Sequence, residues 1–357
     1  FFQAEDGIRA SVASRGLGDV YKRQLLHIGS VSAERGSVSR GGIPVDIDLR
    51  GGTADIPIIV CRGVQDGPVL WLNGATHGDE PEGAFSIFQL LELIDPGQLN
   101  GTIVGVPAIN VPAFAAGTRG NPADTFSYDM NRIYPGSAEG YPTERTAWAH
   151  WMAMEPICDL EIAIHSGGYH SYLAHMIFAA DNPQSLELAG AMGPQWDLVF
   201  RAPTGAANPS SKIAELGKAG ITIELGGNCR SLTNDFHVVA ADLASSYVNV
   251  LRHYGMIGGE AQYVRAWRMG HQQALLAPAS GMFVGNADLR FEEPIDANTL
   301  LGQIYNLHGM IAAEVRAPCD GVVFGLRSRP SVSAGEWCCF FGIIGETSDD
   351  LLTGASG

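Results

Sequence analysis

PVLWLNGATHGDE, the stretch from Pro68 to Glu80, decides the fold. Its first part, Pro68 to Asn73, is a short apolar run without polar alternation, as expected of a strand buried on both faces of a parallel sheet. A loop from Gly74 to Glu82 follows, and an apolar stripe predicts a helix from about Gly83 to Ile94, which Asp95-Pro96-Gly97 ends. A strand, a loop and a helix in this order are typical of an α/β protein.

Other apolar runs predict the rest of this domain. Further buried strands are expected at Thr102 to Ile109, Leu160 to Ile164, and Ile221 to Leu225. Helices are predicted from Pro142 to Met154 and from about Asp235 to Tyr254. Upstream, Ile43 to Leu49 and Ile56 to Val60 flank Gly51-Gly52 and predict a β-hairpin. Strands that alternate with helices indicate an α/β domain over residues 25–258.

The region from 259 to 347 has a different pattern and contains an internal repeat at an offset of 40 residues. Ala277-Pro278-Ala279-Ser280-Gly281 matches Ala317-Pro318-Cys319-Asp320-Gly321. Each copy predicts short strands around a Gly turn, and hence a small β-domain of pseudo-twofold type, which resembles the biotinyl/lipoyl-carrier sandwich. No Lys follows Lys218, so this region carries no lysine-linked biotin or lipoate. A structural role, or a lid beside an active site, is expected.

The two ends of the chain are predicted to lie outside the fold. Residues 1–24 have neither helical nor strand periodicity and are similar to peptides translated from sequencing-adapter DNA. A disordered tail is the alternative interpretation. Residues 348–357 are expected to form a short tail.

Composition excludes several classes of function. The formal net charge is −16, and no Lys/Arg cluster breaks the acidic character, so neither nucleic acid nor an anionic membrane is an expected partner. No stretch reaches the roughly 18 to 20 apolar residues of a membrane span, and no signal peptide is recognisable. The six cysteines form no C-x-x-C pair and are interpreted as free thiols in a reducing cytoplasm. Homo-oligomerisation is left open.

Three side chains at predicted strand ends suggest a metal site. His77 and Glu80 follow the strand Pro68 to Asn73, and His165 follows the strand Leu160 to Ile164. Ligands gather at the carboxyl ends of the strands in an open parallel sheet. Imidazole nitrogen and carboxylate oxygen suit zinc, and a catalytic zinc site has three protein ligands and one open position. A lone histidine is more often structural, but the pair together with Glu80 favours a metal. His170 and His175 follow closely and could contact the same pocket.

Other polar residues near these strand ends could take part in catalysis. Glu224 ends a buried strand, where a carboxylate can have a raised pKa and accept a proton from water; a structural carboxylate is the alternative. Arg119 and Arg132 lie in or after a Gly/Pro-rich loop and could hold a carboxylate or a developing oxyanion. A surface salt bridge is the alternative for Arg119.

Five ordered motifs resemble the succinylglutamate desuccinylase/aspartoacylase family, which is related to the zinc carboxypeptidases, and in particular its N-acetyl-diaminobutyrate deacetylase branch. The motifs are THGDE (76–80), GTR (117–119), DMNRIYPG (129–136), IHSGG (164–168) and IELGG (223–227). The resemblance covers about Gly41 to Ile344. It implies a mixed sheet flanked by helices, as in zinc carboxypeptidases, followed by the small β-domain.

The resemblance also implies a role for each site residue. His77, Glu80 and His165 would bind one zinc ion, and Glu224 would act as general base and then as general acid. Arg119 would polarise the scissile carbonyl. Asn131 and Arg132 would engage the carboxylate of a small N-acyl amino acid.

The function predicted on these grounds is a zinc-dependent amidohydrolase that removes an acyl group from an N-acylated amino acid or a similar amide bearing a carboxylate. A carboxypeptidase-type exopeptidase would share the fold and the metal site and remains an alternative. A metal-binding protein without catalysis is a second alternative. A serine hydrolase is poorly supported, because no G-x-S-x-G motif occurs.

Overall fold

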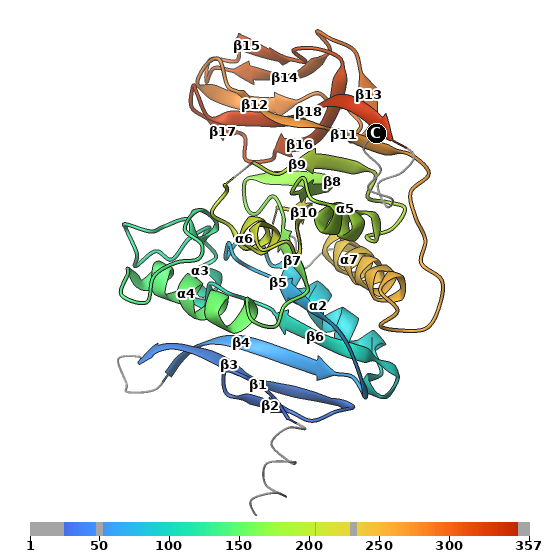
Figure 1. The fold of residues 1–357 in the computed structure, drawn as a ribbon. Helices are drawn as coiled ribbons and strands as arrows, with labels where there is room; N and C mark the ends of the chain where they lie inside the picture. Colours follow the sequence, from blue (N-terminus) through green and yellow to red (C-terminus); the bar gives the residue numbers. More distant parts are fainter. Residues whose placement is uncertain (1–24, 48–52, 204, 229–233, 349–357) are drawn as a thin grey trace, which may run out of the picture.

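The computed structural model describes residues 25–47, 53–203, 205–228 and 234–348. Its centre is a twelve-stranded mixed sheet with the order β13-β16-β18-β11-β9-β8-β10-β7-β5-β6-β4-β3 (Figure 1). The strands of this sheet that precede residue 258 are β3 (Ser37–Ile47), β4 (Thr53–Arg62), β5 (Gln65–Asn73), β6 (Asn100–Val106), β7 (Leu160–His165), β8 (Ser171–Ala179), β9 (Leu198–Arg201) and β10 (Ala219–Gly227). A short ribbon of β1 (Leu26–Ile28) and β2 (Val31–Ala33) precedes them.

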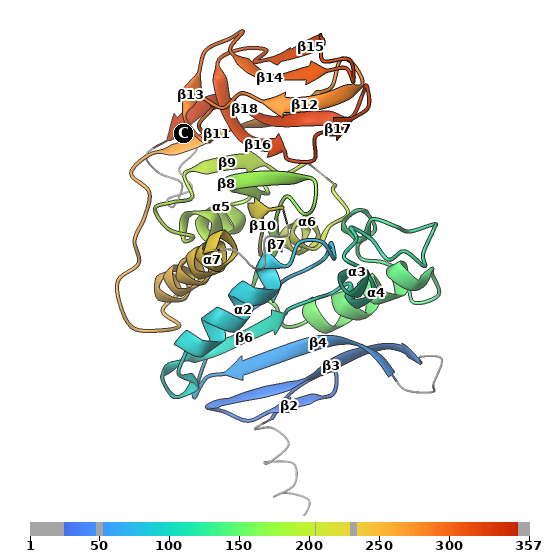
Figure 2. The ribbon, with the colours of Figure 1, turned by 180° about the vertical axis from the view of Figure 1, so that it is seen from behind.

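Helices cover both faces of this sheet (Figures 1 and 2). They are α2 (Glu82–Leu93), α3 (Val111–Ala116), α4 (Pro142–Met154), α5 (Pro183–Gly190), α6 (Pro209–Glu215) and α7 (Asn234–His253). Two 3-10 turns, Pro96–Gln98 and Met130–Arg132, lie in the connections. None of the described helices is both long and apolar enough to cross a membrane.

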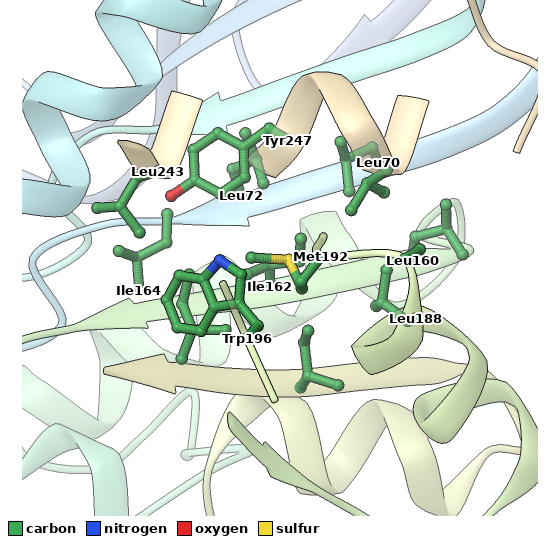
Figure 3. Packing of buried hydrophobic residues seen from close by; sticks show 14 of the residues in the cluster. Leu70, Leu72, Leu160, Ile162, Ile164, Leu188, Met192, Trp196, Leu243 and Tyr247 are labelled. Atoms are coloured by element: carbon green, nitrogen blue, oxygen red, sulfur yellow. The ribbon is translucent and has the colours of Figure 1, made fainter. Parts of the chain in front are cut away.

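The side chains of β5 alternate between the two faces of the sheet and are covered on both. Leu70 and Leu72 pack in the cluster that contains Leu243 and Tyr247 of α7 (Figure 3). Trp71 packs on the opposite face, in the cluster that contains Met154 of α4. All three β5 side chains are fully buried, and a strand buried on both faces reads as a continuous apolar run.

The strands and helices expected before residue 258 are present, although several of their bounds differ from the predicted ones. The helix Pro142–Met154 is confirmed at both ends, and β3 pairs with β4 as the predicted hairpin, although its turn lies outside the described residues. The strand predicted to run to Ile109 ends at Val106 instead. Pro107 follows and has no N–H to donate to a neighbouring strand, and Asn110 then caps α3.

Eight strands follow residue 258 in the described part of the chain. They are β11 (Trp267–Leu276), β12 (Gly281–Gly285), β13 (Pro294–Ile295), β14 (Leu300–Tyr305), β15 (Ile311–Arg316), β16 (Gly321–Arg327), β17 (Ser331–Val332) and β18 (Trp337–Ser348). Strand β11 pairs with β9 and β16 pairs with β8, while β15, β14, β12 and β17 form a separate four-stranded sheet. The main sheet therefore continues across the predicted domain boundary at residue 258.

The internal repeat corresponds to equivalent strands. Gly281 begins β12 and Gly321 begins β16. Strand β12 pairs antiparallel with β14, and β16 pairs antiparallel with β18.

The adjacent Cys338 and Cys339, like the other three described cysteines, are free thiols. Residues 1–24 and 349–357, and with them the predicted leader and nearly all of the predicted tail, lie outside the described residues, as does Cys229.

A buried polar network connects β5 and β7 on the face covered by α4. Asn73 Nδ2 donates to Glu161 Oε1 at 2.6 Å, and Asn73 Oδ1 lies 2.8 Å from His150 Nε2. Burial raises the pKa of Glu161 to about 8 and lowers the pKa of His150 to about 3. Both side chains are therefore uncharged at neutral pH, as buried groups generally are.

This network predicts a pH-dependent stability. An unfolded glutamate titrates near pH 4.3, so between about pH 4 and 8 the folded chain holds a proton at Glu161 that the unfolded chain has lost. Stability from this group is thus present below pH 4 and is lost as the pH rises through 8. Glu161→Gln keeps an acceptor for Asn73 and should raise the free energy of unfolding by at least about 1 kcal/mol at pH 8.5, with little change at pH 5.

Urea unfolding at the two pH values measures this effect. Glu92→Gln, which changes an exposed carboxyl on α2, is the matched control and should have little effect at either pH. An equal effect of Glu161→Gln at both pH values would contradict the assignment of a neutral buried carboxyl.

Candidate metal centre and active site

The site lies at the carboxyl ends of three adjacent strands. Strand β5 pairs in parallel with β6 on one side and with β7 on the other, so the connections leave β5 in opposite directions, and ligands bind at such switch points. His77 and Glu80 lie in the loop after β5, and His165 is the last residue of β7. Glu224 lies on β10 directly opposite His165 in the parallel ladder.

The three predicted ligands converge. His77 Nδ1 lies 2.7 Å from Glu80 Oε1, and His165 Nδ1 lies 2.7 Å from Glu80 Oε2. The two Nδ1 atoms are 3.1 Å apart, and one ligand atom from each residue falls within 4.8 Å of the others. All three residues are buried, with His77 and His165 each 2% exposed.

The donor set fits a zinc ion. Two imidazole nitrogens and one carboxylate form the three-ligand set of catalytic zinc sites, which leaves a fourth position open. Zinc–nitrogen bonds of about 2.0–2.1 Å in a tetrahedral arrangement place two ligand nitrogens about 3.3 Å apart, close to the observed separation of the Nδ1 atoms. Two buried imidazole nitrogens that face each other need a proton or a cation between them.

The pKa shifts of the three residues favour the binding of a cation. Although burial opposes ionisation, His77 and His165 hold the pKa of Glu80 well below its usual range. Burial also opposes the charged form of His77, but Glu80 and Asp129 raise its pKa. Burial, opposed in part by Glu80, lowers the pKa of His165. The carboxylate between the rings is therefore the permanently charged member of the cluster.

Asp129 is a site residue that the sequence analysis did not assign. Its Oδ1 lies 3.0 Å from His77 Nε2, the ring nitrogen that faces away from Glu80. Its Oδ2 accepts from Arg119 Nη2 at 3.1 Å, and Oδ1 also accepts from the backbone N–H of Asn131. A carboxylate on the outer nitrogen of a metal-binding histidine fixes the tautomer and the ring orientation. Its position at the start of the DMNR turn, where Asp caps the 3-10 turn, was the available signal.

Gly78 is required by close approach. A Cβ at this position would lie 2.0 Å from the backbone carbon of Ala113 in α3, so a side chain cannot fit there without moving α3. The φ angle of Gly78 is not in the left-handed region, whereas that of Ala75, in the same loop, is +41°. The loop that carries His77 and Glu80 is thus pressed against α3, which restricts where both side chains can lie.

Glu224 faces the same pocket as the triad. Its Oε2 is buried and has no hydrogen-bond partner among the described residues. Burial, together with the nearby charge of Glu80, raises its pKa well above the usual range, although Arg119 opposes this shift. A desolvated carboxylate without a fixed partner can accept and return a proton.

The structure also places the three predicted substrate contacts at this pocket. Arg119 lies between Asp129 and Glu80, with Nη1 3.6 Å from Glu80 Oε1. Asn131 Nδ2 is 3.4 Å from His165 Nε2, and its buried Oδ1 has no partner among the described residues. Arg132 is exposed and donates to the carbonyl of Asn131. Arg132 is therefore free to meet a ligand, whereas Arg119 is held beside the triad.

The two histidines that follow His165 in the sequence, His170 and His175, have different surroundings. His170 lines the pocket. His175 lies outside the lining of the pocket and forms an ion pair with Asp242 of α7 at 2.6 Å. Hydrogen bonds to Asp242 and Glu292 outweigh burial and raise the pKa of His175 to about 9. His175 therefore has a structural setting outside the site.

The pocket has a volume of about 660 Å³ and extends well beyond the triad. Residues from β8, from the start of α6 and from the C-terminal strands line its other end. Gln272 of β11 and Trp337 and Phe340 of β18 belong to this lining, and no local sequence pattern identifies them. The C-terminal region therefore forms part of the pocket wall.

Comparisons with known proteins show which family this chain is similar to. Residues 66–251 match the sequence model of the succinylglutamate desuccinylase/aspartoacylase catalytic domain. An N-alpha-acetyl-L-2,4-diaminobutyric acid deacetylase from Halomonas elongata is 27% identical over 301 residues, which cover 80% of this chain and 84% of that protein.

Solved structures extend the similarity over most of the chain. A succinylglutamate desuccinylase from Silicibacter sp. TM1040 superposes with a TM-score of 0.77 and 25% identity, over 88% of this chain and 98% of that one. The product-bound ectoine utilization protein EutE (DoeB) from Ruegeria pomeroyi gives 0.76 and 25%, over 90% and 99% of the two chains. The chain therefore belongs to the succinylglutamate desuccinylase/aspartoacylase family, as its motifs predict.

Proposed function

We propose that this chain is a zinc-dependent amidohydrolase that removes the acyl group from an N-acylated amino acid or a similar small amide that bears a carboxylate. The observation that carries the proposal is the convergence of His77, Glu80 and His165 on one buried point, with Glu224 opposite His165 in the ladder. The match of residues 66–251 to a family named for desuccinylation and acylase activity supports deacylation as the reaction.

The metal would be held by His77 Nδ1, His165 Nδ1 and the carboxylate of Glu80. When bound, zinc supplies Lewis acidity, which polarises a carbonyl group and makes a water molecule more acidic. Asp129 would hold the His77 ring in the orientation that directs Nδ1 toward Glu80.

Glu224 would move the protons of the reaction. With a cation bound at the triad, which would oppose the effect of burial and keep Glu224 ionised, its unpartnered Oε2 could accept a proton from the attacking water. The buried carboxyl would then keep that proton until the amine departs. Glu224 would then donate the proton to the nitrogen of the leaving amine, so that the group returns to its starting state. One carboxyl thus serves as base and then as acid.

Arginine and asparagine would orient the substrate. Arg119, held by Asp129 beside the triad, can donate to the oxygen that becomes negative as the carbonyl is attacked. Arg132 and Asn131 can hold the substrate carboxylate, because one has an exposed guanidinium and the other lies at the pocket wall. Holding the carboxylate fixes the amide relative to Glu224.

Broader expectations belong to the same proposal. They are a zinc-carboxypeptidase type of catalytic fold, a C-terminal β-domain of biotinyl/lipoyl-like type, and a cytoplasmic location. Free thiols at the five described cysteines support the last of these.

Metal content provides the first test. The purified chain should carry about one zinc ion per molecule, as the three-ligand set implies, and His165→Ala should lose most of it because one of three ligands is removed. Elemental analysis after gel filtration measures the zinc. His308→Ala, at an exposed histidine, should retain it. Full zinc content in His165→Ala would refute the ligand assignment.

Glu224→Gln separates catalysis from metal binding. It keeps the shape of the side chain but removes the proton acceptor, so kcat/KM should fall by about 10² to 10⁴-fold, the usual contribution of general acid–base catalysis. Zinc content should be unchanged, and the exposed Glu92→Gln should remain active. Wild-type turnover in Glu224→Gln would mean that another group moves the proton.

Arg132→Ala tests recognition of the carboxylate. Loss of a charge-assisted contact made before and during the reaction should raise KM by roughly tenfold with a smaller effect on kcat. The same substitution should have little effect on a substrate whose carboxylate is blocked as an amide. An equal loss on both substrates would show that Arg132 acts in another way.

A panel of substrates separates the alternative functions. Hydrolysis of short peptides in preference to N-acyl amino acids would indicate a carboxypeptidase-type exopeptidase. Normal zinc content without hydrolysis of any member of the panel would indicate a metal-binding protein that is not an enzyme.

A further inference from the structure

The lining of the pocket includes two groups of side chains, called here the charged end and the apolar arm. The charged end contains the triad, Glu224, Arg119 and Arg132. The arm, defined here as Leu173, Met176, Phe178, Ala206, Trp337 and Phe340, lies toward β8 and β18. This division constrains which substrate the site can accept.

The walls of the arm are built from packed hydrophobic side chains. Leu173 and Met176 are 4% and 2% exposed and belong to a cluster against which Phe178 and Phe340 pack. The rings of Trp337 and Phe340 stack at 4.5 Å with an interplanar angle of 15°. Side chains fixed by such packing form a preformed apolar surface.

The described residues of the arm include no arginine or lysine to bind a second carboxylate. Among the described residues that line the pocket, Arg119 and Arg132 are the only arginines or lysines, and both belong to the charged end. A carboxylate placed in the arm would lose its hydration without gaining an ion pair, which is costly. A succinyl or other dicarboxylic acyl group therefore does not fit the arm.

Two polar side chains near the arm, Ser210 and Asn208, already form hydrogen bonds within the protein. Ser210 Oγ donates to the carbonyl of Ile221 at 2.9 Å and lies 3.0 Å from Thr222 Oγ1. Asn208 Oδ1 accepts from the backbone N–H of Ser211. These side chains do not require a polar partner from the ligand.

The size of the pocket adds a second constraint. The whole pocket, at about 660 Å³, lies in the middle of the range for drug-sized ligands, so it has room for an N-acyl amino acid whose acyl group is larger than acetyl. When the carboxylate is held at Arg132 and the amide lies beside the triad, the acyl chain and the amino-acid side chain are the two substituents that the rest of the pocket has to accommodate.

We infer that the apolar arm between β8 and β18 binds the acyl chain, and that the preferred substrates carry a neutral, apolar acyl group larger than acetyl. This inference rests on the proposed deacylase function. It gives the C-terminal strand β18 a role in substrate choice through Trp337 and Phe340, which lie far along the sequence from the metal triad.

The test compares N-acetyl, N-hexanoyl and N-succinyl derivatives of the same L-amino acids. The hexanoyl compounds should have a kcat/KM at least about tenfold above that of the acetyl compounds, because the four additional CH₂ groups become buried, and the succinyl compounds should be the poorest. Phe178→Ala and Phe340→Ala should each reduce the ratio of hexanoyl to acetyl by about threefold or more. Phe88→Ala, which removes an exposed ring from α2, should leave the ratio unchanged.

The outcomes separate the two proposals. A preference for acetyl or succinyl groups, or a preference governed by the amino-acid side chain, would overturn the inference and leave the deacylase function intact. Absence of hydrolysis for every compound would overturn the proposed function. Calorimetric titration of the hexanoyl and succinyl compounds into Glu224→Gln then still tests the arm, since tighter binding of the hexanoyl compound is expected and equal binding contradicts it.

Discussion

The bridge formed by Glu80 between two imidazoles is the interaction on which the rest of the site depends. One carboxylate oxygen lies 2.7 Å from His77 Nδ1 and the other lies 2.7 Å from His165 Nδ1, although 85 residues separate Glu80 from His165. A buried carboxylate is tolerated only with such partners. The parallel pairing of β5 with β7 brings the two segments together, and the contact of Gly78 with α3 keeps the loop in place.

Four carboxyl groups surround this point, and their environments separate their pKa values. Histidine and arginine neighbours, against the effect of burial, keep Glu80 and Asp129 ionised. Burial raises the pKa of Glu224 well above the usual range and that of Glu82 to about 7. Glu82 accepts from Ser166 Oγ and from Gly227 N, and so ties the ends of β7 and β10 together. Such a separation distinguishes carboxylates suited to a cation from a carboxyl suited to proton transfer.

The sequence predicted the parts of this site that depend on local pattern and strand direction. Apolar runs locate strands, parallel strands end at the same edge, and hence His77, His165 and Glu224 were expected to be neighbours. Asp129 was not assigned a role, because its contact with His77 depends on the path of a long loop. Strand β8 was not predicted, because Ser171, Tyr172 and His175 interrupt its apolar run, although most of its residues are buried. Trp337 and Phe340 were missed because only the tertiary fold brings β18 to the pocket.

The continuous sheet explains how one chain can keep its chemistry and vary its substrate. His77 and Glu80 lie in the loop after β5, and His165 and Glu224 lie on β7 and β10, whereas the arm is formed largely by β8 and β18. Strand β16 pairs with both β8 and β18, so the arm walls are held by ladder hydrogen bonds that do not involve the triad. A side chain on β8 or β18 can therefore change in size or charge without displacing a metal ligand. Met176 of β8 lies opposite Glu224 in the antiparallel ladder with β10, whereas β18 pairs with β11 and β16. Under the proposed function, a change at Trp337 or Phe340 would therefore alter the arm with less effect on Glu224 than a change on β8.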